Sequence, residues 1–291
     1  MHFYVTQPYV NLHRIMSEPT KPGEAGSTIA YGKLEEMTIE EIRNFHPEVA
    51  VFPLGSTEPH GPHLPYGTDT LIARGGATAA VREANARGAR VLELPCLPIG
   101  NNVNFKAYPL ACRVRVETLF SFICDIADFL LEEGIRKLVL LNAHGGNVAT
   151  VEAALRRIHD AHAGELFACG SMISAFRKPG TPEVFNDLSP HAGDYETSLI
   201  LHLAPGLVRR EQMGPAEMMS PAVAGLGNPS IYWVKPWHEL MPSSCGGRPD
   251  WATEEKGREY FEDCVHGFAD FLVELSRTPW QPRFPYSDAS R

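Results

Sequence analysis

The chain has 291 residues, 44% of them apolar, and 35 acidic residues against 26 basic ones give a formal charge of −9. The length allows one large α/β domain or two small ones, and the apolar fraction is sufficient for a sizeable core. The sequence has no Lys/Arg-rich run and no apolar stretch near the roughly 20 residues that a membrane helix needs, so we expect neither nucleic acid nor membrane as a partner. It has no signal-peptide pattern and no CxxC pair among its six cysteines, which favours reduced thiols and a cytoplasmic protein.

Apolar and amphipathic segments alternate along most of the chain. A capping-box pattern at Thr38 and Glu41 predicts a short helix over 39–45. Strands are expected at 49–54, 91–94, 137–141 and 166–173, of which the apolar runs 49–54 and 137–141 should be buried, and helices at about 70–88, 116–133, 148–163, 195–203 and 252–277. Strands that alternate with helices in this way predict a mainly parallel sheet covered by helices on both faces.

The regular pattern occupies the middle of the chain. Residues 1–35 are irregular and are interpreted as an N-terminal arm, 36–278 as a single domain, and 279–291 as a loose tail. Within the domain, residues 206–250 are rich in proline and include Trp233 and Trp237. We interpret this segment as an elaborated rim or a contact between subunits.

The first predicted strand ends in an unusual loop, FPLGSTEPHGPHLPYGTD, over residues 52–69. It carries Glu58, His60, His63 and Asp69, separated by three prolines that fix φ and stiffen the backbone. A stiff loop with two carboxylates and two imidazoles is typical of a preorganised metal site. The alternative is a polar loop whose histidines are only solvated.

Two later segments carry similar groups. The third predicted strand ends in NAHGGN, which places His144 beyond its carboxyl end, where parallel sheets bind ligands; His-Gly-Gly could also be a simple tight turn. The segment HAGDYETS adds His191, Asp194 and Glu196, although Glu196 could serve only as a favourable charge at a helix start. Without a thiolate, the combined donors suit Zn²⁺, Mn²⁺ or Fe²⁺, and five of them fit two ions with one bridging carboxylate.

The segments PLGSTEPHGPHLPYGTD, NAHGGN, HAGDYETS and GGRPDWATEEKG resemble the creatininase (creatinine amidohydrolase) family over about residues 33–275. The resemblance implies a three-layer α/β/α sandwich, a binuclear metal centre and a homohexamer. By motif it implies that Glu58, Asp69 and His144 hold one ion, and that His60, Asp69 and an acidic residue hold the other. His191 would carry a proton to the leaving nitrogen, and Asn142, Gly145, Gly146 and Asn147 would contact the substrate.

The chain departs from creatininase in two places. Where creatininase has NGHYEN with a metal-binding glutamate, this sequence has Gly146, so we expect Glu196 to supply the missing carboxylate. Creatininase also covers its flat substrate with tryptophans from the region that corresponds to 145–190, which contains no Trp in this chain. Creatinine is therefore not the expected substrate.

The expected function is that of a binuclear metal-dependent hydrolase that cleaves a C–N bond of a small cyclic amide or related compound with a metal-bound hydroxide, assisted by His191 and Glu196. A first alternative is a metal-dependent C–C hydrolase or isomerase that acts on a polyhydroxylated cyclic ketone of the oxidised-inositol type. A non-enzymatic, metal-stabilised binding protein is disfavoured because structural zinc sites are closed and usually rich in cysteine.

Overall fold

Four parallel strands form the centre of the molecule. The computed structural model describes residues 31–181, 183–185, 191–228, 230–281 and 283–286, so most of the expected N-terminal arm and part of the expected tail lie outside the described residues. The strands are β1 (Val49–Leu54), β2 (Val91–Glu93), β3 (Lys137–Asn142) and β4 (Phe167–Met172), in the order β2-β1-β3-β4. All three pairings are parallel, which confirms the expected sheet.

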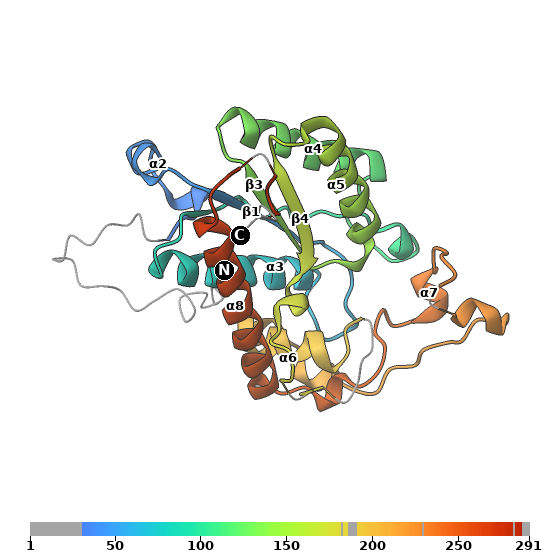
Figure 1. Cartoon of the computed structure of the whole chain (residues 1–291). Coiled ribbons are helices and arrows are strands. Elements are labelled where there is room, and N and C mark those ends of the chain that lie inside the picture. Colours follow the sequence, from blue (N-terminus) through green and yellow to red (C-terminus); the bar gives the residue numbers. More distant parts are fainter. Residues whose placement is uncertain (1–30, 182, 186–190, 229, 282, 287–291) are drawn as a thin grey trace, which may run out of the picture.

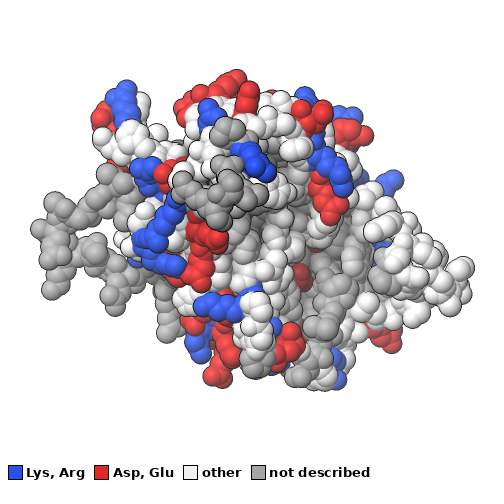
Figure 2. Space-filling view, viewed as in Figure 1, with Lys and Arg blue, Asp and Glu red and all other residues white. Residues whose placement is uncertain are grey.

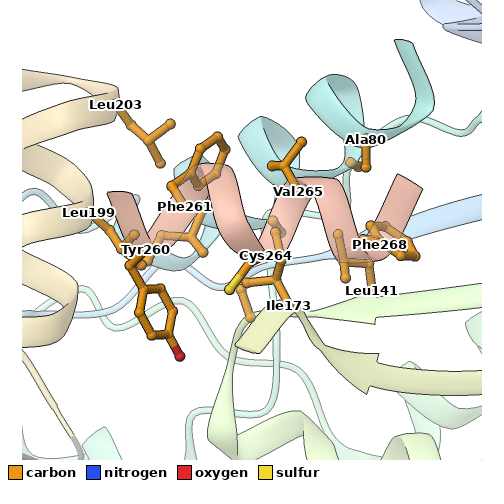
Figure 3. Close-up of a cluster of buried hydrophobic side chains, with 14 of the residues drawn as sticks. Ala80, Leu141, Ile173, Leu199, Leu203, Tyr260, Phe261, Cys264, Val265 and Phe268 are labelled. Atoms are coloured by element: carbon orange, nitrogen blue, oxygen red, sulfur yellow. The ribbon is translucent and has the colours of Figure 1, made fainter. Parts of the chain in front are cut away.

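Helices cover both faces of this sheet, as Figure 1 shows. On one face lie α4 (Val116–Glu132) and α5 (Val148–His162), which pack on the sheet through one apolar cluster. On the other face, α3 (Thr68–Ala86), α6 (Asp194–Leu203) and α8 (Glu254–Arg277) share a second cluster. Figure 3 shows its centre, where side chains of α8 such as Phe261 and Phe268 lie among residues of α3, α6 and the end of β3. The α/β/α sandwich is therefore confirmed.

The helix ends follow from local chemistry. The short α2 (Ile39–Phe45) begins with the expected capping box, because the Thr38 side chain accepts from the Glu41 amide and the Glu41 carboxylate accepts from the Thr38 amide. The next helix, α3, begins at Thr68, two residues before the expected start near Thr70. Asp69 is consequently in the first turn of α3, where its carboxylate interacts favourably with the positive end of the helix dipole.

The strand order places β1 and β3 side by side at the centre of the sheet. After β1 the chain crosses to α3 on one face, and after β3 it crosses to α5 on the other. A crevice opens where connections leave neighbouring strands in opposite directions, and such switch points commonly bind ligands. The loops after β1 and β3, which carry the sequence-predicted site residues, both begin there.

Between α6 and α8 the chain leaves the sandwich. This projecting segment (residues 213–228 and 230–242) includes the short α7 (Trp237–Leu240) and extends away from the sheet at the right of Figure 1. Figure 2 shows that its visible surface is mainly uncharged. Its exposed large apolar side chains are Met218, Met219, Val223, Ile231, Tyr232, Trp233 and Val234.

The remaining structural features agree with the composition. No helix in the described part of the chain is both long enough and apolar enough to span a bilayer. The six cysteines are all free thiols, as expected.

Glu93, at the end of β2, is a buried carboxylate outside the predicted metal site. Glu93 is 1% exposed. Its Oε1 accepts from the Thr78 hydroxyl at 2.8 Å, and its Oε2 has no hydrogen-bond partner among the described residues. Burial is the main cause that raises the pKa of Glu93 from 4.5 to about 7. The folded protein therefore holds this proton more tightly than the unfolded chain does.

This difference predicts a pH-dependent stability. Because the folded pKa is the higher one, the contribution of Glu93 is fully present below about pH 4.5 and is lost as the pH rises through about 7. Glu93→Gln keeps the bond to Thr78 without a charge, so we expect it to stabilise the fold by about 2–3 kcal/mol at pH 8 and by little at pH 4.5. Urea unfolding at both values measures this, with the exposed Glu165→Gln as control. An equal effect at the two pH values would contradict the role of burial.

Candidate metal centre

The loop after β1 supplies the first two groups of the site. Glu58 and His60 follow the strand directly and are 1% and 0% exposed. The Thr70 hydroxyl donates to the Ser56 carbonyl at 2.9 Å and so joins the start of α3 to this loop. That bond places Asp69, on the first turn of α3, beside the two loop residues.

Two further segments complete the cluster. His144 comes directly after β3, and a short 3-10 turn (Gly145–Asn147) then leads into α5. Gly146 allows a close approach here, because a Cβ at this position would lie 2.3 Å from the Asn101 carbonyl oxygen and 2.4 Å from His144 Nε2. Glu196 projects from the first turn of α6, and the Ala192 amide donates to its carboxylate.

Asp69 lies at the centre of this cluster. Its Oδ1 is 3.2 Å from His60 Nε2, and its Oδ2 is 3.2 Å from His144 Nδ1. Glu58 Oε2 is 3.3 Å from the same nitrogen of His144, and Glu196 Oε2 is 3.7 Å from His60 Nε2. Three sets of donor atoms could each surround one ion: Glu58, Asp69 and His144; His60, Asp69 and Glu196; and Glu58, His60 and His191.

Each of the three imidazoles is oriented by a backbone carbonyl. His60 Nδ1 lies 3.1 Å from the Glu58 carbonyl oxygen, His144 Nε2 lies 3.0 Å from that of Asn101, and His191 Nε2 lies 2.8 Å from that of Pro59. A carbonyl oxygen only accepts, so each of these ring nitrogens carries the hydrogen. The other nitrogen of every ring then points at the carboxylates. Histidine ligands of metals are held in this way.

The electrostatics of the cluster favour a positive charge at its centre. Burial alone would lower the pKa of His60, but the Asp69 and Glu196 carboxylates outweigh it and raise that pKa to about 10. Burial also raises the pKa of Glu196 to about 7. Buried atoms without a hydrogen-bond partner among the described residues include His60 Nε2 and Asp69 Oδ2, both at the centre of the cluster. A cation between these atoms would satisfy both, so the residues fit a metal centre.

The cluster forms the floor of a cavity of about 1010 Å³. Glu58, Asp69, His144, His191 and Glu196 all line it, and so do Gly145 and Gly146. Its aromatic wall consists of Phe105, Tyr195, Tyr232, Trp233 and Trp237. A ligand in this cavity would therefore lie between the candidate metal centre and a set of aromatic rings.

Several sequence-predicted residues have other roles. The amides of Asn142 and Asn147 were expected to contact the substrate, but neither belongs to the described lining. Asn142 Nδ2 donates to the His144 carbonyl at 2.7 Å within the loop after β3, whereas Asn147 Nδ2 donates to the Gly55 carbonyl at 3.2 Å and so joins the loops after β3 and β1. His63 is directed away from the cluster and bonds Thr197 Oγ1 at 2.8 Å. Asp194 pairs with Lys256 of α8 at 2.8 Å.

The sequence did not predict where the aromatic wall comes from. No tryptophan occurs in 145–190, yet Trp233 and Trp237 reach the cavity from the projecting segment. Trp237 stacks on Phe105 with ring centroids 5.7 Å apart, and its ring lies 5.5 Å from that of His191. The sequence had identified residues 206–250 as an elaborated rim, but nothing in it indicated which aromatic rings of this segment face the cavity.

Comparison with known proteins gives one family. Residues 35–272 match the family model Creatininase, described as creatinine amidohydrolase. The mycofactocin precursor peptide peptidase of Mycobacterium tuberculosis is 29% identical over 264 residues, which cover 84% of this chain and 93% of that protein. The creatinine amidohydrolase of Pseudomonas putida is 28% identical over 246 residues, which cover 78% of this chain and 89% of that protein.

Solved structures agree with these matches. A crystal structure from Bacteroides fragilis, assigned as a creatinine amidohydrolase, superposes with a TM-score of 0.76 at 27% identity and covers 87% of this chain and 99% of its own. A manganese form of creatininase, 25% identical, superposes with a TM-score of 0.68 and covers 85% of this chain and 99% of its own. A Zn–Zn form of a creatininase variant, also 25% identical, superposes with a TM-score of 0.66 and covers 84% of this chain and 98% of its own.

Proposed function

Because this chain belongs to the creatininase family of metal-dependent hydrolases, we propose that it hydrolyses a C–N bond with two divalent ions bound at the carboxylate–histidine cluster. The observation that carries the proposal is the central position of Asp69, whose two oxygens face two different imidazoles at 3.2 Å. One ion would be held by Glu58, Asp69 and His144, and the other by His60, Asp69 and Glu196. Zinc and manganese are the proposed metals, since related creatininases carry them.

The residues around the cluster support hydrolysis. Bound ions would polarise a substrate carbonyl and lower the pKa of a water molecule toward about 7. The side chains of Glu58, His60, Asp69, His144 and Glu196 would hold these ions. His191, whose Nδ1 is 4.0 Å from Glu58 Oε1, is placed to take a proton and to pass it to the departing nitrogen. The aromatic wall limits access of bulk water from that side.

The cavity also restricts the substrate. Ligand cavities commonly range from roughly 300 to 1,000 Å³, so this one has room for more than a single small ring. No Lys or Arg occurs among its described lining residues, whereas Glu152 is a carboxylate outside the cluster. We therefore propose a neutral or cationic amide with an apolar or aromatic part. A peptide amide fits this description as well as a cyclic amide does, and the mycobacterial relative is a peptidase.

The test is a metal-dependent substrate screen. The purified full-length chain, loaded with zinc or manganese, is offered lactams, cyclic ureides, formamides, short peptides and oxidised inositols, with neutral, cationic and anionic members of each amide class. We expect cleavage of a C–N bond that stops on chelation and returns with added metal. Turnover that survives complete metal removal, or turnover of oxidised inositols without that of any amide, would overturn the proposal.

We also propose that the chain forms a homohexamer in the cytoplasm. The exposed apolar side chains of the projecting segment, including Met219, Ile231 and Val234, are numerous for a surface that faces only water. Burial against other subunits would remove them from solvent, and closed symmetry is the rule for soluble oligomers. We expect light scattering at micromolar concentration to give a mass of six chains. A monomeric mass would refute this assembly.

A further inference from the structure

A turn late in the chain holds the segment that contains His191. The turn consists of residues 243–247, Ser-Ser-Cys-Gly-Gly, between α7 and α8. The Gly246 amide donates to the His191 carbonyl at 3.0 Å, and the Cys245 thiol donates to the Ala192 carbonyl at 3.2 Å. These two bonds fix the backbone on which the imidazole is mounted.

The side chain of Ser244 reaches the imidazole itself. Its hydroxyl donates to the Pro59 carbonyl oxygen at 2.8 Å. This carbonyl oxygen also accepts a hydrogen bond from His191 Nε2–H, at 2.8 Å. Ser244 Oγ also lies 3.5 Å from His191 Nε2. The ring nitrogen that carries hydrogen is therefore enclosed by two oxygens, and Nδ1 is left to face Glu58 at 4.0 Å. The rings of His60 and Phe105, with centroids at 4.1 and 5.1 Å, leave the imidazole little room to flip.

The backbone of this turn is strained in a way that fits a positioning role. Ser244 has φ +56° and Ala192 has φ +53°, the left-handed region that side chains other than glycine seldom adopt. Both residues are buried, at 2% and 0% exposure. Strain of this kind persists only where the surrounding structure imposes it, and it is concentrated at functional sites.

We propose that Ser244 is a positioning residue for His191. With the Pro59 carbonyl, its hydroxyl holds the imidazole as the Nε2–H tautomer, and Nδ1 faces the metal cluster as a proton acceptor. In each cycle Nδ1 takes one proton from the attacking water as the water oxygen bonds to the carbonyl carbon, and gives that proton to the departing nitrogen as the C–N bond breaks, while Nε2–H stays on the ring. The kinetic consequence rests on the proposed function, but the orientation of the ring does not.

Kinetics on three variants test the role of the hydroxyl. Ser244→Ala removes it, and Ser244→Gly removes both it and the left-handed strain, so the glycine variant should fold even if the alanine variant does not. We expect each to lower kcat roughly 10-fold with KM and metal content nearly unchanged. Ser243→Ala is the matched control and should retain wild-type kcat, because the one hydrogen bond of that hydroxyl to the described residues is to the Cys245 carbonyl at 3.5 Å. Wild-type kcat in Ser244→Gly, or a loss of metal in proportion to kcat, would overturn the proposal.

A second measurement requires no turnover and so separates this inference from the proposed function. Neutron diffraction of the zinc-loaded wild-type protein should show deuterium on His191 Nε2 and none on Nδ1. In the Ser244→Ala or Ser244→Gly protein the imidazole should be displaced or should occupy two orientations. Deuterium on Nδ1 alone in the wild type, or an unmoved ring in the variants, would contradict the assignment even if the substrate screen succeeds. The expected neutron result would support it even if the screen finds no amide substrate.

Discussion

Asp69→Asn is expected to lose both metal ions and to lower turnover by on the order of 10³-fold or more. Each oxygen of the Asp69 carboxylate faces a different imidazole at 3.2 Å, so one side chain serves both proposed ion positions. An asparagine keeps the size but replaces one of these oxygens by an NH₂ group that cannot bind a cation. Even an outer partner of a metal ligand commonly contributes 10–100-fold, so a shared direct ligand should contribute more.

Metal analysis of purified protein measures this effect, and a second variant provides the contrast. Glu196→Gln should release only the ion proposed to lie between His60, Asp69 and Glu196, and should leave about one metal per chain. Asp160→Asn on the exposed face of α5 is the matched control and should keep two. Unchanged metal content in Asp69→Asn would reject Asp69 as a bridge between the two ions. Unchanged metal content in Glu196→Gln would reject Glu196 as the replacement for the glutamate that creatininase has at the position of Gly146.

His191→Ala is expected to lower kcat by roughly 10²–10⁴-fold while both metals stay bound, because general acid–base groups contribute that much. Burial, together with the charge of His60, lowers the pKa of His191 well below its ordinary value of 6.5. The neutral ring directs Nδ1, the nitrogen without hydrogen, toward Glu58 of the cluster, which is the form required to accept a proton. Steady-state kinetics on the best substrate from the screen, with metal content determined in parallel, measure the loss.

The structure leaves two other roles for His191, and each predicts a different failure. As an orienting partner of a ligand, its loss would weaken metal binding by about 10–100-fold, and excess metal would partly restore activity. As a ligand itself, in the set with Glu58 and His60, its loss would lower the number of bound ions. His159→Ala, on an exposed turn of α5, controls for the loss of a histidine. Wild-type turnover in His191→Ala with metals in place would exclude the proton shuttle.

The sheet was predictable because its two central strands, β1 and β3, consist largely of apolar residues. A strand such as Val49–Leu54 is buried at every position, and a parallel sheet covered on both faces requires this. The boundaries were less certain: β2 ends at Glu93, one residue before the expected end, and α3 begins at Thr68. Helix starts shift by a turn according to capping and tertiary contacts, which periodicity does not contain.

The candidate cluster was predictable where its residues closely follow a strand, as Glu58, His60 and His144 do. Its walls were not, because they depend on packing between segments far apart in the chain. His60 and His63 look equivalent in the sequence, but Thr197, which binds His63, comes from α6. The inward orientation of Trp233 and Trp237 depends on the path of the projecting segment, which has little regular structure and so no periodic signal.

The packing of α6 on α8 has a consequence for biosynthesis. Synthesis runs from the N-terminus, so Glu58, His60, Asp69 and His144 are available to a nascent chain long before α8 has been made. Glu196 is positioned later, because α6 is fastened by Lys256 to Asp194 and by the close approach of Gly257, where a Cβ would lie 1.9 Å from the Ser198 carbonyl oxygen. A chain that is truncated before Lys256 would therefore contain every proposed ligand but lack the support that holds Glu196 in place.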